Sequence, residues 1–209
     1  MNLSECKDRA RQYYTDLPYH TFDHALAVLD HAETLLDRCH RYDVPVNDDV
    51  VRGAVLFHDA GYHRDLSHHG YDSKEAYSAA IAKKELEELG MSPDFIERVA
   101  ACIISTHRQA PFDLAEEKVV RAADLAGLAA DYETFEANSN ALRKEHERLE
   151  DTTITDEQWC QMMKTTIEGY LQQDIRLTPE HSADGVSTFH QQARTNLNRF
   201  IEKHCENHD

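Results

Sequence analysis

The stretch from Val51 to Gly61 constrains the fold most, because an apolar run leads directly into an adjacent histidine and aspartate. The run predicts a buried helix, and Gly61 can take the left-handed conformation that closes a helix. Burying His58 and Asp59 costs free energy unless both find partners. A divalent cation would satisfy both, since imidazole nitrogen and carboxylate oxygen suit first-row transition metals. The alternative is an ordinary helix end at which the two side chains only cap or hydrogen-bond.

Apolar residues recur at helical spacing through most of the chain, and helix-capping residues precede the apolar stripes. Only 7 of the 209 residues are glycine and 5 are proline, which favours long helices joined by short loops. We therefore predict an all-α fold. A composition shift near residue 131 suggests a core over residues 1–131 and a C-terminal helical extension over residues 132–209 that packs on it.

The net charge of -17 argues against binding of a nucleic-acid duplex and against an anionic membrane surface. The N-terminal residues are polar and charged, so we expect no signal peptide and a cytoplasmic protein. The five cysteines are scattered and have no metal-binding spacing, which favours a reducing compartment over a disulfide framework. A homodimer is compatible with these features.

Four polar side chains lie on, or at the ends of, otherwise apolar predicted helices. Asp124 is the most informative, because it stands between two pairs of apolar residues and would destabilise the fold without a cation or a hydrogen-bond donor. Two histidines and two carboxylates from three helices can form a mononuclear metal site, although none of the spacings is a local metal motif. The four are His24, His58, Asp59 and Asp124.

These residues carry a resemblance to the HD superfamily of metal-dependent phosphohydrolases, which are all-helical. Tyr19–His24 is similar to the "YHN-x-x-H" element of several branches, and Phe57–Tyr62 resembles the defining His-Asp motif. Ala122–Ala126 resembles the closing aspartate segment, and Asp72–Ala79 is similar to the "D-N-E-x-x-S-A" segment of one predicted branch. The resemblance covers roughly residues 13 to 131, and four short pieces occur in the family's order.

The resemblance implies that His24, His58, Asp59 and Asp124 hold one divalent ion per chain, which would be Mn, Fe, Co, Ni, Zn or Mg. The expected substrate is a small phosphate ester, such as a nucleotide or a related metabolite, attacked by a water that the metal activates.

Three further roles follow from the same resemblance. Asp59 would also orient or deprotonate the attacking water. His20, four residues before the first ligand, is a candidate general acid, although it could equally cap the next helix or pack on Tyr19. Glu75 would orient a water or a ligand histidine, although a glutamate in a first helical turn is also favoured by the helix dipole.

Two alternative functions remain open on the sequence. A di-iron oxygenase, which also occurs on HD scaffolds, would need His69 and His107 as further ligands; a non-catalytic regulatory module would keep the metal or only the fold. Arg64, Lys74 and Arg108 are candidate cations for a substrate phosphate, although surface cations are usually only solvated.

Overall fold

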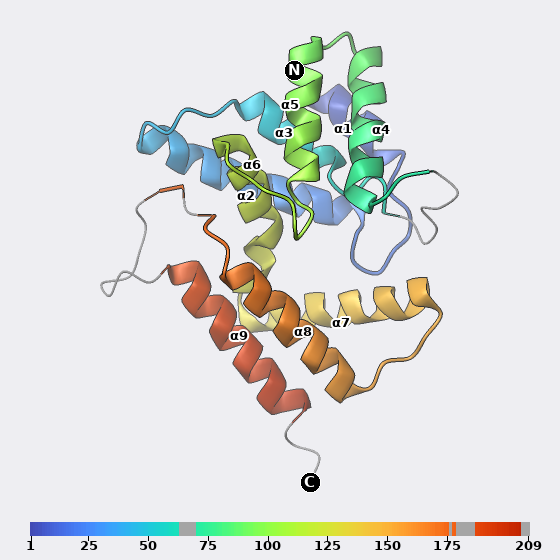
Figure 1. Ribbon diagram of the computed structural model, residues 1–209, viewed down its shortest axis with the longest axis vertical. Coiled ribbons are helices and arrows are strands. Elements are labelled where there is room, and N and C mark those ends of the chain that lie inside the picture. Colours follow the sequence, from blue (N-terminus) through green and yellow to red (C-terminus); the bar gives the residue numbers. More distant parts are fainter. Residues whose placement is uncertain (63–69, 176, 179–186, 206–209) are drawn as a thin grey trace. The chain divides into compact units, whose positions relative to one another are not determined.

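A computed structural model describes residues 1–62, 70–175, 177–178 and 187–205. All regular structure in these residues is helical, which confirms the all-α prediction (Figure 1). None of the described helices is long and apolar enough to cross a bilayer. In chain order the elements are α1 Leu3–Arg11, α2 Phe22–Arg41, α3 Asp48–Phe57, α4 Lys74–Glu88, α5 Pro93–Ile104, α6 Ala115–Asp124, the 3-10 helix η2 Leu125–Ala129, α7 Tyr132–Glu150, α8 Asp156–Leu171 and α9 Thr188–His204.

The chain separates into two compact units, each with its own apolar core. Unit 1 consists of Met1–Asp124 and Ile175–Thr178, and unit 2 consists of Leu125–Asp174 and Pro179–Asp209. The division falls at the end of a helix: α6 ends at Asp124, and the residues that follow form the 3-10 helix η2.

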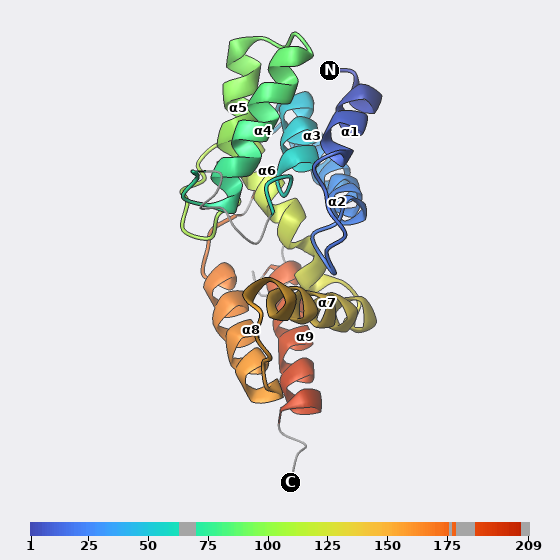
Figure 2. The same ribbon diagram turned by 90° about the vertical axis from the view of Figure 1, so that its right-hand side faces the viewer.

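Unit 1 is built around α3, whose residues from Val50 to Phe57 are almost all buried. Helices α1, α2, α4, α5 and α6 all pack against it. Helices α4 and α5 lie side by side in both views (Figures 1 and 2). The side chain of Asn47 caps α3 by accepting hydrogen bonds from the backbone N–H groups of Asp49 and Val50.

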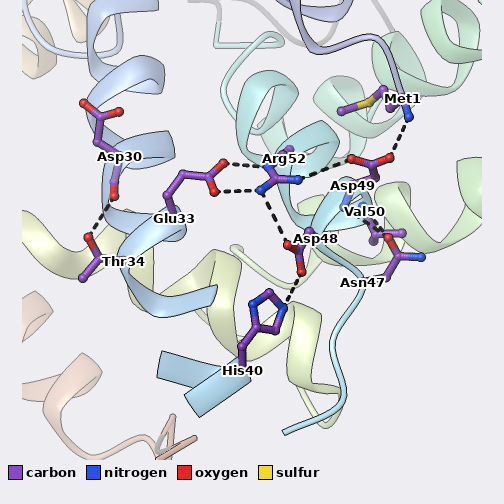
Figure 3. Close-up of polar contacts among 10 residues, drawn as sticks. All are labelled: Met1, Asp30, Glu33, Thr34, His40, Asn47, Asp48, Asp49, Val50 and Arg52. Atoms are coloured by element: carbon purple, nitrogen blue, oxygen red, sulfur yellow. Dashed lines mark hydrogen bonds and ion pairs between the residues drawn. The ribbon is translucent and has the colours of Figure 1, made fainter. Parts of the chain in front are cut away.

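A polar network joins the start of α3 to α2 (Figure 3). The Arg52 guanidinium donates to both carboxylate oxygens of Glu33, at 2.6 and 2.8 Å. The amino group of Met1 lies 2.6 Å from Asp49, and His40 lies 3.0 Å from Asp48. Because the bidentate pair fixes α3 against α2, these contacts help to set the distance between the helices that carry His58 and His24.

Unit 2 contains η2, α7, α8 and α9, and α8 packs beside α9. Thr155 and Gln158 form a capping box at the start of α8. Cys160 of α8 and Cys205 after α9 are joined as a disulfide, whereas the sequence favoured reduced cysteines. The other three cysteines are buried free thiols in unit 1.

Candidate metal centre

The four side chains singled out in the sequence converge in unit 1. One ligand atom from each of His24, His58, Asp59 and Asp124 lies within 4.8 Å of the other three. His58 Nε2 lies 2.9 Å from Asp59 Oδ2 and 3.4 Å from Asp124 Oδ1. His24 Nε2 lies 3.6 and 3.7 Å from the same two oxygens. The ligand atoms therefore surround one point, although the residues come from α2, the end of α3 and the end of α6.

Three of these atoms are buried without a hydrogen-bond partner: His24 Nε2, His58 Nε2 and Asp59 Oδ2. Buried polar atoms in folded proteins are almost always hydrogen-bonded, so three orphans at one point need a common explanation. Two imidazole nitrogens and two carboxylate oxygens are a donor set that divalent transition metals accept. The residues present therefore fit a divalent cation.

The backbone orients His58 for this role. His58 is almost completely buried, and its Nδ1 lies 2.7 Å from the carbonyl oxygen of Val55. A carbonyl can only accept, so Nδ1 carries the proton and, in the neutral ring, Nε2 keeps its lone pair for a ligand. Just before this residue, the hydroxyl of Tyr14 donates to the carbonyl of Leu56 at 3.1 Å.

His24 lies in the first turn of α2. The N-cap is Thr21, and its hydroxyl accepts from the backbone N–H of His24 at 3.2 Å. This cap fixes the position of the His24 backbone at the helix start.

The charges of the cluster shift one another's pKa. Burial disfavours a charged His58, but Asp59 and Asp124 outweigh it and raise the pKa of that imidazole well above 6.5. Burial likewise raises the pKa of Asp124, but the neighbouring imidazoles of His24 and His58 lower it more, so the net shift is downward. For Asp59, burial is outweighed by His58 and then by His20, and the pKa falls. Both carboxylates are thus available as anionic ligands.

The turn after α3 departs from the sequence prediction. Gly61 does not adopt the left-handed conformation; the glycines with positive φ among the described residues are Gly70 and Gly90. Glycine is needed at position 61 because a Cβ there would lie 2.6 Å from the backbone nitrogen of Ser78 and 2.9 Å from the carbonyl oxygen of Lys74. The Gly61 N–H donates to the Ser78 hydroxyl at 2.8 Å. A close approach to α4 therefore explains this glycine.

The remaining predicted site residues lie in different places. The imidazole of His20 borders the cluster, with its ring centroid 5.8 Å from that of His24. Glu75 lies in the first turn of α4 and is not one of the four grouped side chains. His107 also lies outside that group, and its Nδ1 accepts from the N–H of Gln109. His69 and Arg64 lie outside the described residues.

Two residues with notable contacts in unit 1 were not singled out from the sequence. Tyr62 stacks on His20, with ring centroids 3.7 Å apart and an interplanar angle of 16°. Arg121 is almost completely buried in α6 and donates to the carbonyls of Ser105, His107 and Arg108, which follow α5. A charged residue inside an apolar helix was a usable signal for Arg121; nothing in the sequence pattern indicated the stacking of Tyr62.

No protein-family model matches the chain, and no curated protein matches it. By contrast, 32 chains of solved structures match. One is the phosphodiesterase LmjPDEB1 in complex with IBMX, at a TM-score of 0.64 and 14% sequence identity. The match covers 93% of this chain and 77% of that chain. At this identity the comparison shows a shared all-helical fold.

Proposed function

We propose that this chain is a metal-dependent phosphohydrolase of the HD superfamily that hydrolyses a small phosphate ester, such as a nucleotide or a related metabolite. The observation that carries the proposal is the convergence of three buried, unpartnered ligand atoms with Asp124 at one point. The order of the motifs supports it, and so does the fold shared with a phosphodiesterase.

Each residue has a defined task in this proposal. His24, His58, Asp59 and Asp124 hold the ion, with His58 fixed in one tautomer by the Val55 carbonyl. When bound, a divalent ion lowers the pKa of a water molecule and stabilises the negative charge that develops on the phosphoryl oxygens.

Proton transfer falls to Asp59, which also holds the ion, and to His20. Asp59 is the carboxylate placed to orient the attacking water and to accept its proton. His20 borders the cluster and is held on Tyr62, so its ring nitrogen is placed to donate a proton to the leaving oxygen. The role of Glu75 as an orienting group remains a proposal from the resemblance alone.

The test is elemental analysis of protein purified without chelator or His-tag, followed by a screen of phosphate esters. We expect one divalent metal per chain, lost in Asp59→Ala together with hydrolysis. Asp30→Ala is the matched control, since Asp30 is an exposed aspartate of α2 outside the cluster. It should keep both metal and activity.

Two results would contradict the proposal. Two irons per chain with oxygen-dependent turnover would favour the di-iron oxygenase. Absence of metal from the wild-type protein, even after soaking in Mn²⁺ or Ni²⁺, would remove the catalytic account and leave a helical binding module.

A further inference from the structure

Two successive carbonyl groups near the end of α3 are bonded by side chains. The carbonyl oxygen of Val55 lies 2.7 Å from Nδ1 of His58. The next carbonyl, that of Leu56, accepts a hydrogen bond from the hydroxyl of Tyr14 at 3.1 Å. The last carbonyls of a helix have no partner within the helix, so side chains can satisfy them. One of these two side chains belongs to the metal-binding cluster, and the other, Tyr14, does not.

The Leu56 carbonyl needs an outside donor because the chain leaves the helix just beyond it. Helix α3 ends at Phe57, and the N–H of Ala60 donates to the carbonyl three residues back, that of Phe57, at 3.0 Å. In a continuing α-helix this N–H would have bonded to Leu56 instead. Leu56 is completely buried, and a buried carbonyl without a donor costs free energy. The Tyr14 hydroxyl therefore stabilises the turn that begins here.

The ring of Tyr14 contacts a second helix that contributes to the cluster. It meets the ring of Phe22 edge-on, with the two centroids 5.5 Å apart. Phe22 is buried at the first position of α2, two residues before His24. The guanidinium carbon of Arg11 lies 4.2 Å from the centroid of the same ring. Because edge-to-face aromatic pairs are favourable beyond the area they bury, Tyr14 restrains the start of α2 as well as the end of α3.

Electrostatics agree with a position beside the cluster. Burial, and after it the charge of Asp59, raises the pKa of the Tyr14 phenol well above 10. The charge of Asp124 acts in the same direction, while backbone hydrogen bonding to Asp59 partly opposes the rise. The phenol therefore keeps its proton at neutral pH and remains a donor to the carbonyl of Leu56.

We propose that Tyr14 is a positioning residue of the metal centre, since its hydroxyl and its ring hold the helix ends that carry His58 and His24. The ring centroids of these two histidines lie 5.6 Å apart. Metal–ligand distances in a well-formed site vary by only about 0.2 Å, so a small shift of either helix end weakens binding of a shared ion. The inference rests on the proposed function only through its metal site, and it adds a residue that supplies no ligand atom.

The test is the Kd of the metal-free, full-length protein for Co²⁺, with the ligand-field absorption of the bound ion recorded during the titration. Tyr14→Phe removes the hydroxyl and keeps the ring. It should weaken Co²⁺ binding about tenfold, because groups that orient metal ligands are worth about 10–100-fold in affinity. It should also change the absorption spectrum, which reports the geometry of the ligands. Tyr14→Leu removes the ring as well and should weaken binding more than Tyr14→Phe does.

Tyr13→Phe is the matched control. The hydroxyl of Tyr13 donates to the carboxylate of Glu85 in α4, which is not one of the four clustered residues. This variant therefore loses a side-chain hydrogen bond of the same unit, and it should keep the wild-type Kd and spectrum. A loss of overall stability does not change the Kd while nearly all molecules are folded, and circular dichroism checks that condition for each variant.

Equal Kd values for Tyr14→Phe and Tyr13→Phe would overturn the inference, and so would a Tyr14→Phe spectrum identical to that of the wild type. Its failure is distinguishable from failure of the proposed function. Ester hydrolysis by a protein whose Kd is independent of Tyr14 would overturn the inference alone. A Kd that depends on Tyr14, without hydrolysis of any ester, would support the inference and overturn the function. A wild type that binds no Co²⁺ would overturn both.

Discussion

The two units differ in the hydrogen bonding of their buried polar groups. In unit 2, the indole N–H of Trp159 donates to the hydroxyl of Ser139 at 3.0 Å. The side chain of Asn196 donates to the carbonyls of Leu128 and Ala130, at 3.0 and 2.9 Å. These polar groups satisfy one another, and their effect is to fix α8 on α7 and α9 on η2 and the residues after it.

In unit 1, by contrast, buried polar atoms from separate helices come together at one place. His24 Nε2, His58 Nε2 and Asp59 Oδ2 face the same point and have no hydrogen-bond partner. Among the described residues, one other buried side-chain nitrogen or oxygen has no hydrogen-bond partner, and it is Nδ1 of His190 in unit 2. The other ring nitrogen of His190 is hydrogen-bonded to the carbonyl oxygen of Leu171. The comparison teaches that clustered orphan atoms, rather than buried polarity itself, distinguish a binding site from a well-packed core.

The largest expected effect is stabilisation of unit 1 alone by metal. A ligand at about 100 times its Kd stabilises the folded state that binds it by about 2.7 kcal/mol. Mn²⁺ at that concentration should therefore increase the hydrogen-exchange protection of α3 and α6 and leave that of α8 and α9 unchanged. The effect should vanish in Asp124→Ala. Equal protection of both units would contradict a metal site that lies in unit 1 alone.

The second effect concerns a polar group that is satisfied within unit 2. Asn196→Ala leaves two backbone carbonyls without their donor and should lower the free energy of unfolding by about 1–3 kcal/mol. Urea unfolding, followed through Trp159 of the same unit, measures the loss. Asn198→Ala is the control, because Asn198 is an exposed asparagine of the same helix. A similar loss in both variants would mean that the buried contacts contribute nothing.

The smallest effect is a pH dependence in unit 2. Burial raises the pKa of Glu136, but Lys203 and His204 lower it more, so that the net pKa falls from 4.5 to about 2. A carboxyl with a lowered folded-state pKa stabilises the fold above its unfolded pKa, and this contribution disappears as pH falls from about 4.5 to 2.

We expect less than about 1 kcal/mol from Glu136, because its partner Lys203 is half exposed to solvent. The measurement is the free energy of unfolding between pH 6 and about 3, compared with Glu136→Gln. An identical pH profile in the two proteins would show that the pair is too solvated to matter.

Local signals in the sequence were sufficient to predict the helical fold and where helices begin. Capping is a contact between neighbours in the chain, so capping residues could be expected just before the apolar stripes, and the structure has Thr21, Asn47 and Thr155 there. The convergence of His24 and Asp124 could be expected because both are polar residues on otherwise apolar helices, and the family resemblance supplied their order.

Contacts between segments that are far apart in the chain account for what the sequence could not show. Gly61 has two common explanations, positive φ or close packing, and only the position of Ser78 on α4 decides between them. The stack of Tyr62 between His20 and Lys74 depends on that same approach. The break after Asp124 likewise has no glycine or proline to mark it, since it is followed by Leu125 and Ala126.

The four clustered residues are spread from position 24 to position 124 and come from α2, the end of α3 and the end of α6. An unfolded chain would have to close two long loops to bring them together, and it would lose that conformational entropy with little in return. The site therefore comes into being only when α2, α3 and α6 have docked. Metal uptake by this protein would be a late event in its folding, and a metal-loaded molecule would be one whose first unit is already complete.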